Sequence, residues 1–325
     1  MEVRWVDQLE KMALWHQVSS ARFLGPVRFR QLWRIYGDDI GRVFHMSDGE
    51  LSRIKGVFNR QSIQGIRHQV SKYRHSQDFI KRQLERAEKC GGTIVALGDP
   101  LYPEFLANSN FCHAIVYCIG DLTSVKGCGK VVAIVGTRYP AAESCEFARR
   151  IARELSRCGW VVASGMAKGI DAEAHRGALD ADGKTIAVLG CGPDVIYPRE
   201  SVELHRDIAT RGLLLSEFPF GDRVDELKLK KRNKTIVATS RGVFLVESDV
   251  TGGAMNAVAT CREQNKILMT ILPEWPGRIS GNREAAGKDA FVVPIGPNSF
   301  SQIVSLLESE LPGLTAHLLN PRLKQ

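Results

Sequence analysis

Val131-Val-Ala-Ile-Val-Gly-Thr-Arg138 and, further along, Gly159-Trp-Val-Val-Ala-Ser-Gly-Met-Ala-Lys-Gly-Ile-Asp171 decide the fold of this chain. Each begins with an apolar run of strand length and ends abruptly in small residues. An unbroken apolar run is typical of a strand buried on both faces, as in a parallel sheet covered by helices. Helical sequence follows each run, from Ala141 to Cys158 and from Ala172 to Leu179. This repeat predicts that the intervening loops line the edge of the sheet where ligands bind.

The same alternation continues toward the C-terminus. Further strands are predicted at Thr185–Leu189, Gly212–Ser216, Gly242–Glu247 and Lys266–Leu272, with helices at Glu200–Arg211, Lys234–Ser240 and Ala254–Gln264. Gly- and Pro-rich sequence then runs to Pro297, and a final helix is predicted from Ser299 to Leu311. Strands that alternate with helices indicate an α/β protein with a doubly wound, mostly parallel sheet.

The N-terminal part has a different pattern, because residues 5–90 read as helical throughout. Leu24-Gly-Pro26 predicts a turn before a helix over Val27–Tyr36, with the proline near its first turn. Helix–turn–helix units of this kind grip a DNA backbone in some proteins and only pack in others. Strands predicted at Thr93–Leu97 and Ile115–Asp121 would bridge to the main sheet. We therefore expect a helical domain over 1–88, resembling SAM or helix-hairpin-helix modules, and a main domain over 89–325.

The basic charge is concentrated in the helical part. The whole chain of 325 residues carries a formal net charge of +8, and residues 1–90 hold 17 Lys and Arg against 10 Asp and Glu. An anion site in the nearly neutral remainder must therefore come from local clustering. The eight cysteines form no C-x-x-C pair and are expected to be reduced. With no apolar run of about 20 residues and no secretory leader, a cytoplasmic protein without a membrane partner is expected.

The loops after the first two core strands combine groups that bind phosphate. Each brings glycine, a hydroxyl and a basic residue to the sheet edge: Gly136-Thr137-Arg138, then Ser164-Gly165 with Lys168-Gly169. Backbone amides at a helix start favour anions. Thr251-Gly-Gly-Ala254 opens a later helix in the same way, or is a plain glycine turn. Lys228-Leu-Lys-Lys-Arg-Asn-Lys234, with five basic residues in seven, reads either as a solvated loop and helix start or as a third basic loop. Three such loops favour an extended polyphosphate.

Other chemistry is disfavoured by the same residues. The turn after Val135 has Gly136 but lacks the second and third glycines of G-x-G-x-x-G, and the chain has no P-loop motif. Asp171 and His175 lie four residues apart on one predicted helix, a spacing found in relays but more often in a helix-start carboxylate with a surface partner. Glu247 and Asp249 could cap a loop. Because no set of nucleophile, base and orienting group is evident, binding without turnover is expected.

With these residues in view, the chain resembles the DprA/Smf family of DNA-processing proteins. The resemblance rests on Leu97-Gly-Asp-Pro-Leu-Tyr-Pro103, Ala133-Ile-Val-Gly-Thr-Arg138, Ser164-Gly-Met-Ala-Lys-Gly-Ile-Asp-Ala-Glu-Ala-His175, Leu215-Ser-Glu-Phe-Pro219, Arg232-Asn233 and Thr251-Gly-Gly253. It implies an extended Rossmann-like core, single-stranded DNA binding, loading of a RecA-type recombinase in natural transformation or recombination, and a homodimer. Arg138, Lys168, Arg232 and Asn233 would hold phosphates and bases, while the glycines let the strand approach the backbone.

The expected nucleic-acid site comprises Gly136, Thr137, Arg138, Ser164, Gly165, Lys168, Gly169, Lys230, Lys231, Arg232, Asn233, Lys234, Thr251, Gly252 and Gly253. No catalytic residue, metal or cofactor is expected. Arg138, Lys168 and Arg232 are expected in loops, so that reversing their charge weakens DNA binding without unfolding the protein.

The chain departs from the family pattern at several points. Leu229 stands where the family has phenylalanine, Lys234 replaces an arginine, and Thr251-Gly-Gly replaces Ser-Gly-Ser. Leu272-Pro-Glu-Trp-Pro-Gly277 replaces Pro-Gly, and no winged helix is expected after residue 311, so a divergent member is indicated. Phe218 or Phe220 is a candidate for the lost stacking ring. The alternative function is nucleotide binding or sensing within the wider superfamily, in defence against foreign DNA. Hydrolysis is disfavoured because Gly252-Gly-Ala-Met-Asn-Ala-Val lacks the hydrolase glutamate.

Overall fold

The computed structural model of the chain describes residues 2–123, 125 and 127–309. A nine-stranded sheet crosses this part of the chain in the order β1-β2-β6-β5-β4-β3-β7-β8-β9. Its strands are β1 (Gly92–Ala96), β2 (Ile115–Gly120), β3 (Val131–Val135), β4 (Val161–Ser164), β5 (Thr185–Val188), β6 (Leu213–Ser216), β7 (Gly242–Leu245), β8 (Ile267–Thr270) and β9 (Phe291–Val292). β3 to β9 pair in parallel, so the predicted doubly wound, mostly parallel sheet is confirmed.

β1 and β2 belong to this sheet and do not merely connect it to the helical domain. β1 pairs with β2, and β2 pairs with β6, both in antiparallel fashion. The two strands therefore bridge the helical domain to the main sheet, as predicted, and they do so as members of the sheet itself. An antiparallel strand needs no crossover helix, so the two strands extend one edge of the sheet directly.

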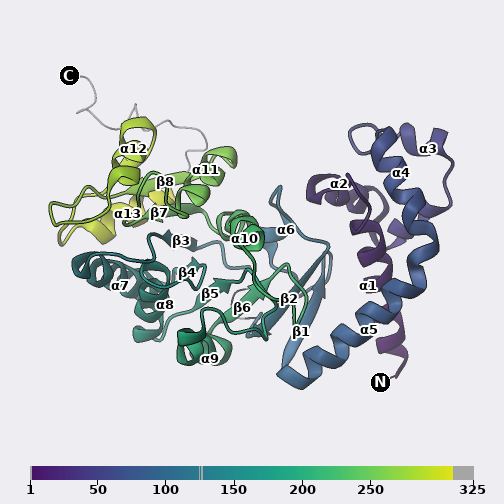
Figure 1. Cartoon of the computed structure of the whole chain (residues 1–325), viewed down its shortest axis with the longest axis horizontal. Helices are drawn as coiled ribbons and strands as arrows, with labels where there is room; N and C mark the ends of the chain where they lie inside the picture. Colours follow the sequence, from purple (N-terminus) through teal and green to yellow (C-terminus); the bar gives the residue numbers. More distant parts are fainter. Residues whose placement is uncertain (1, 124, 126, 310–325) are drawn as a thin grey trace.

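Helices α1 to α5 stand together beside the β1 edge of the sheet, and the later helices lie against the rest of it (Figure 1). They are α1 (Glu2–Ser19), α2 (Pro26–Tyr36), α3 (Asp48–Ser52), α4 (Arg60–Gln69), α5 (Tyr73–Cys90), α6 (Glu104–Ala107), α7 (Ala142–Arg157), α8 (Ile170–Asp180), α9 (Val202–Arg211), α10 (Glu226–Thr239), α11 (Met255–Glu263), α12 (Ser280–Lys288) and α13 (Ser299–Glu308). Short 3-10 turns η1 (Gly37–Phe44), η2 (Val70–Lys72) and η3 (Arg199–Ser201) join some of them.

Alternate residues of β3 enter two different cores. Val132 and Ile134 pack with Phe147 of α7 and Ile303 of α13. Val131, Ala133 and Val135 face the opposite side, where α10 and α11 pack. All five β3 side chains are buried, as expected for a strand covered on both faces. Because α7 follows β3 on one face and α11 follows β7 on the other, the crossovers diverge between these two neighbouring strands.

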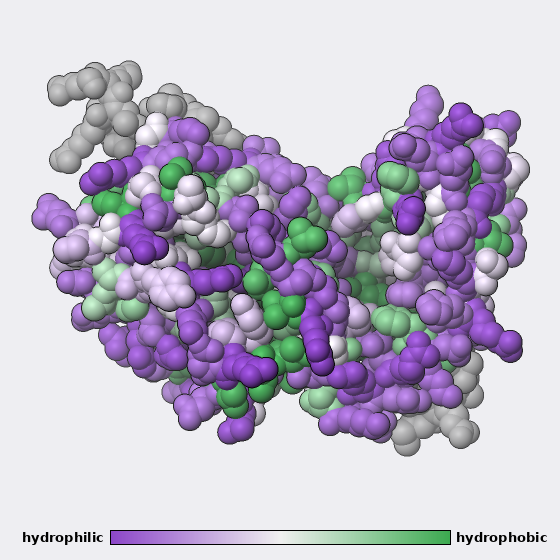
Figure 2. Space-filling view, in the orientation of Figure 1, coloured by the Kyte–Doolittle hydropathy of each residue, from purple (hydrophilic) through white to green (hydrophobic). Residues whose placement is uncertain are grey.

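The N-terminal helices pack tightly against the antiparallel edge. Trp15, Phe29 and Ile80 belong to the same hydrophobic cluster as Ile94 of β1 and Tyr117 of β2. Figure 2 shows the surface dipping between the N-terminal helices and the body that carries the sheet. The last helix, α5, ends at Cys90 before a left-handed glycine. The domain boundary predicted after residue 88 remains a prediction.

Polar contacts reinforce this junction at both ends of the helical part. Arg30 Nη1 donates to the carbonyl of Asn108 at 2.9 Å. Arg86 Nε lies 2.8 Å from a carboxylate oxygen of Asp194. These bonds fix the orientation of the helices relative to the sheet.

The sequence missed several elements and misplaced others. α6, α12 and β9 were not predicted, because short elements in Gly- and Pro-rich sequence carry little periodicity. α10 was predicted to begin at Lys234 and begins at Glu226, where the Asp225 side chain accepts from the Lys228 N–H and caps the helix. α13 ends at Glu308, and the predicted end at Leu311 lies outside the described residues. Within the described residues, no helix is both long enough and apolar enough to cross a membrane.

Candidate functional site

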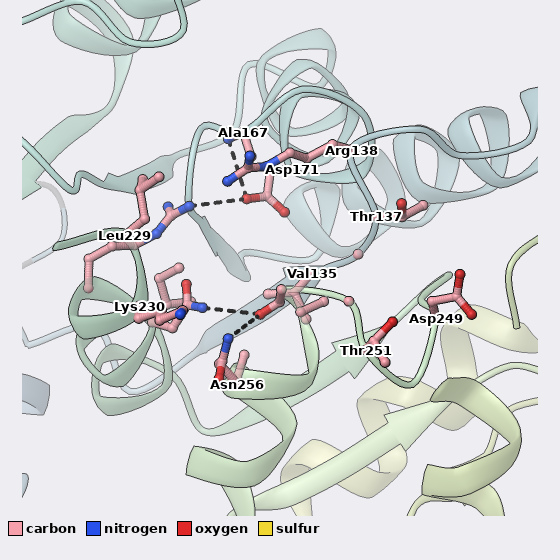
Figure 3. Close-up of a pocket in the computed structure, with 18 of the residues that line it drawn as sticks. Val135, Thr137, Arg138, Ala167, Asp171, Leu229, Lys230, Asp249, Thr251 and Asn256 are labelled. Atoms are coloured by element: carbon pink, nitrogen blue, oxygen red, sulfur yellow. Dashed lines mark hydrogen bonds and ion pairs between the residues drawn. The ribbon is translucent and has the colours of Figure 1, made fainter. Parts of the chain in front are cut away.

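A pocket of about 590 Å³ opens at the carboxyl ends of β3 and β7 (Figure 3). This is the place where the crossovers diverge, and open α/β sheets bind ligands at such a point. The wall combines the loop after β3, one face of α10 and the loop after β7. Its lining residues include Gly136, Thr137, Arg138, Tyr139, Asp171, Leu229, Lys230, Arg232, Asn233, Asp249, Thr251, Gly252, Gly253, Asn256 and Arg278.

The loop after β3 is fixed by Glu247, which follows β7. The Thr137 N–H donates to the Glu247 carbonyl at 2.7 Å, and the Ala141 N–H donates to Glu247 Oε2 at 3.0 Å. The other carboxylate oxygen accepts the N–H of Arg278 at 3.0 Å. Glu247 is 1% exposed, so both oxygens are committed to backbone donors and the residue acts as a loop cap. Arg138 and Tyr139, between these fixed points, are exposed.

The basic run lies on a helix and not in a loop. Because α10 spans Glu226–Thr239, its side chains are divided between two faces. Lys230 and Asn233 face the pocket. Lys231 Nζ instead lies 2.6 Å from Glu217 Oε2, and Lys234 Nζ lies 5.2 Å from the centre of the Phe111 ring. The prediction of a third converging basic loop is wrong, since three of the five basic side chains, Lys228, Lys231 and Lys234, make contacts away from the pocket.

Arg232 is the main correction to the predicted site, because it is buried and does not lie in a loop. Its side chain is 5% exposed, and its Nη2 lies 3.9 Å from Asp171 Oδ2. Nη1 donates to the Val188 carbonyl at 2.9 Å, while Nε has no partner in the described structure. The guanidinium thus forms the floor of the pocket. Burial raises the pKa of Asp171, and the positive charge of Arg232 acts in the opposite direction.

The predicted glycines contact protein atoms that explain them. A Cβ at Gly165 would overlap the Arg232 guanidinium, and a Cβ at Gly136 would meet Ile170. Gly169 has a φ of +77° and packs against the Thr137 carbonyl. Ser164 is fully buried and its hydroxyl donates to the Ile134 carbonyl at 2.6 Å. The structure does not bring Ser164, Gly165 or Gly169 to the pocket surface, because internal packing occupies them.

Lys168 lies outside the main pocket, in an adjoining hollow of about 420 Å³. This second hollow shares Arg138, Tyr139 and Ala167 with the first and adds Tyr197. The Lys168 ammonium forms an ion pair with Glu200. Lys168 is therefore on the same sheet edge as Arg138, as predicted, but one loop further along.

The loop Thr251–Gly253 supplies the most open backbone of the site. Nothing lies within 4 Å of the position where a Cβ would stand at Gly253, so a ligand can approach this glycine directly. The Gly253 carbonyl accepts from Asn256 Nδ2 at 3.2 Å and from Asn233 Nδ2 at 3.4 Å. These bonds, drawn in Figure 3, join α10 to the start of α11 across the pocket floor.

Asp171 and His175 are buried, which corrects the expected surface pairing. His175 is 0% exposed, and its Nδ1 lies 2.7 Å from Thr185 Oγ1. The Thr185 hydroxyl donates to the Val162 carbonyl, so His175 Nδ1–H is the donor to Thr185. Burial, with the positive charges of Arg232 and Arg176, lowers the pKa of His175 to about 3. The histidine is a neutral core residue.

This histidine gives a prediction for acid stability. The unfolded chain binds a proton at His175 below pH 6.5, whereas the folded chain does so only near pH 3, so stability falls as the pH drops between these values. The slope from this residue is about 1.4 kcal/mol per pH unit. Urea unfolding at pH 6 and pH 5 measures how the free energy of unfolding changes with pH. His175→Gln should reduce this change by the contribution of the histidine. An unchanged slope would contradict the burial of a neutral imidazole.

Several pocket residues were missed by the sequence reasoning. Tyr139, Asn256 and Arg278 line the pocket, and Tyr139 stood beside the predicted Arg138. Phe218 and Phe220, the candidates for a stacking ring, are 7% and 2% exposed and therefore buried. In the part of the chain that the structure describes, no cluster of His, Cys, Asp or Glu is placed to hold a metal ion.

Comparisons with known proteins show which family this chain resembles. The family model described as DNA recombination-mediator protein A matches residues 93–302. Protein Smf from Synechocystis is 30% identical over 270 residues, covering 82% of this chain and 65% of that protein. DNA processing protein DprA from Bacillus subtilis is 30% identical over 192 residues, covering 59% of this chain and 64% of that protein. The chain thus spans less than two thirds of the length of either relative.

Solved structures show the same fold. DNA processing protein A from Streptococcus pneumoniae superposes with a TM-score of 0.70 at 23% identity, covering 91% of this chain and 97% of that one. DNA processing protein A from Helicobacter pylori, whose structure was described for its single-stranded DNA binding mode, gives 0.59 at 25% identity, covering 66% and 96%. The matched family region runs from β1 into α13 and includes every wall of the pocket. The resemblance predicted from the sequence is therefore confirmed, and the chain belongs to the DNA recombination-mediator protein A family.

Proposed function

We propose that this protein binds single-stranded DNA along the sheet edge that carries the two pockets. The observation that carries the proposal is the convergence of Arg138, Lys230 and Arg278 on one pocket beside the open backbone at Gly253. All three cations are exposed and come from separate segments of the chain. Cations around a hollow suit a single strand of nucleic acid, because its phosphates can contact the cations while a base enters the hollow.

The shape of the site favours a single strand over a duplex. A hollow of about 590 Å³ has the volume of a small-molecule site, so it can take a base or nucleotide that projects from the backbone. A duplex keeps its bases paired and presents phosphates to such a surface. The relative from Helicobacter pylori binds single-stranded DNA according to its description, which supports the same ligand here.

The proposal includes further roles that rest on family membership. We propose that the protein protects the strand, helps a RecA-type recombinase to load, and acts as a homodimer in the cytoplasm. A family described as recombination mediators supports this view. Sedimentation of the purified protein across a concentration series tests the dimer. Strand-exchange assays with a recombinase, with and without this protein, test the loading.

We propose binding without catalysis. The carboxylates that line the pocket are engaged, Asp171 with Arg232, Glu226 with Lys230 and Asp249 with the Ser280 hydroxyl. Glu247, behind the pocket wall, accepts from backbone N–H groups. We expect no release of base from nucleoside monophosphates and no nuclease activity. Base release that Asp171→Ala or Glu247→Ala abolishes would support the alternative, a nucleotide-binding protein.

The first test compares ligands at two salt concentrations. We expect a labelled oligothymidylate of about 15 nucleotides to bind more tightly than the matching duplex. Three phosphate contacts predict a slope of log K against log salt of about −2, at −0.7 for each contact. Fluorescence anisotropy between about 50 and 200 mM salt measures this. Equal duplex affinity, a flat salt response, or displacement by free nucleotides at equal phosphate concentration would contradict the proposal.

A further inference from the structure

We propose that Tyr139 is the residue on which a base of the bound strand stacks, and that its ring separates two nucleotide subsites. This inference rests on the proposed function and deepens it. It concerns a residue that the sequence did not single out. Three features support this role: the position of the ring, the hydrogen bonds that fix its loop, and the burial of Phe218 and Phe220.

Tyr139 lies between the two hollows at the charged edge of the sheet. It is 72% exposed, and it lines both the larger pocket and the adjoining hollow. The residues common to the two hollows are Arg138, Tyr139 and Ala167, so the ring stands on the ridge between them. Single exposed apolar residues are common, and exposure alone would carry nothing. A ring between two hollows at a charged edge is a more specific arrangement.

The pairing of Tyr139 with Arg138 matches the repeat of a nucleic acid. Each nucleotide carries one phosphate and one base, so a strand-binding site needs a cation and a flat surface side by side. Figure 3 shows the Arg138 side chain extending over Asp171 at the mouth of the larger pocket. Lys168 and Tyr197 continue the same combination of cation and ring into the adjoining hollow. Two successive nucleotides can therefore lie on either side of Tyr139.

The loop that carries Tyr139 is already in place before any ligand binds. The Tyr139 N–H donates to Thr137 Oγ1 at 3.3 Å. Glu247 holds the backbone on both sides, through the N–H groups of Thr137 and Ala141. Because few backbone torsions remain to be ordered, little conformational entropy is lost when a base stacks on the ring.

The two phenylalanines considered from the sequence as stacking rings, Phe218 and Phe220, are buried and not available for stacking. The centre of the Phe218 ring lies 5.7 Å from Lys228 Nζ and 5.4 Å from Lys231 Nζ, and the residue is 7% exposed. Phe220 packs edge-on against Tyr117, with the ring centres 5.6 Å apart. Leu229 lines the larger pocket and has no π face. Among the described residues that line this pocket, Tyr139 is the aromatic one.

The test compares Tyr139→Ala with Tyr139→Phe on a single-stranded oligothymidylate. Loss of one stacked base predicts about tenfold weaker binding for Tyr139→Ala, and retention of the ring predicts a change within about twofold for Tyr139→Phe. The salt slope should stay the same in both variants, because no phosphate contact is removed. Phe23→Ala is the matched control, since Phe23 is also exposed, at 59%, but belongs to the helical part.

A second oligonucleotide separates stacking from a structural effect. An abasic strand of the same length keeps its phosphates and offers no base. Wild-type protein should bind it about tenfold more weakly than oligothymidylate, and Tyr139→Ala should bind it as the wild type does. Equal affinity of Tyr139→Ala and wild type for oligothymidylate overturns the inference, and so does an equal loss on both strands. If the wild type retains neither strand, the proposed function fails and the inference fails with it.

Discussion

Arg138→Glu is expected to weaken binding of single-stranded DNA by about 100-fold, because the change removes one phosphate contact and places a like charge beside the next. Arg138 is exposed, lines both hollows and lies on the fixed loop after β3. The salt slope should become shallower by about one phosphate contact. Anisotropy titrations at several salt concentrations measure both quantities, and urea unfolding should show an unchanged stability.

Arg157→Glu provides the matched control for this change. Arg157 is an exposed arginine in the last turn of α7, before β4 begins. It therefore lies near the amino ends of the parallel strands, whereas the pocket lies at their carboxyl ends. Reversal of its charge alters the net charge equally and should change the affinity by less than about threefold. If the two variants lose affinity equally, the effect is one of overall charge and the pocket is not the DNA site.

Arg232→Glu is expected to destabilise the fold by about 3–5 kcal/mol, the usual cost of removing one partner of a buried ion pair. The new carboxylate would lie next to Asp171 in a place that is 5% exposed. The Val188 carbonyl would also lose its donor. This result differs from the sequence-based expectation, in which Arg232 was a loop residue whose reversal leaves the fold intact. Urea unfolding at neutral pH measures the loss.

Lys230→Glu is the control on the same helix, two residues earlier. The Lys230 side chain is 57% exposed and pairs with Glu226 one turn away, so its reversal should cost less than about 1 kcal/mol. A loss below about 1 kcal/mol for Arg232→Glu as well would mean that the guanidinium leaves its buried position in solution. In that case Arg232 would reach the strand, as the family resemblance implies.

The sequence predicted the core of the fold well, because buried parallel strands produce unbroken apolar runs. The runs at β3 and β4 were found to within a residue or two, and Arg138 was placed on the correct edge. The direction of β1 and β2 could not be predicted, since apolar runs look alike in either orientation. Their pairing depends on β6, which lies far along the chain.

The site was predicted only in part, for two physical reasons. The sequence shows how many basic residues Lys228–Lys234 contains, but not which of them face the pocket. That depends on the residue at which α10 begins. The capping by Asp225 that sets this start leaves only a weak signal in the sequence. The glycines were attributed to a ligand, although Ile170, Arg232 and the Thr137 carbonyl are what exclude a side chain there. Such contacts join residues distant in sequence and become visible only in three dimensions.

The hydrophobic cluster shared by the N-terminal helices and the sheet has a practical consequence for truncation. A fragment that begins at residue 89 would lack Trp15, Phe29 and Ile80, which share a hydrophobic cluster with Ile94 and Tyr117. Newly exposed apolar surface of this kind promotes aggregation. Limited proteolysis near Gly91 should therefore yield an insoluble larger piece, and the two parts should melt together in a single calorimetric transition.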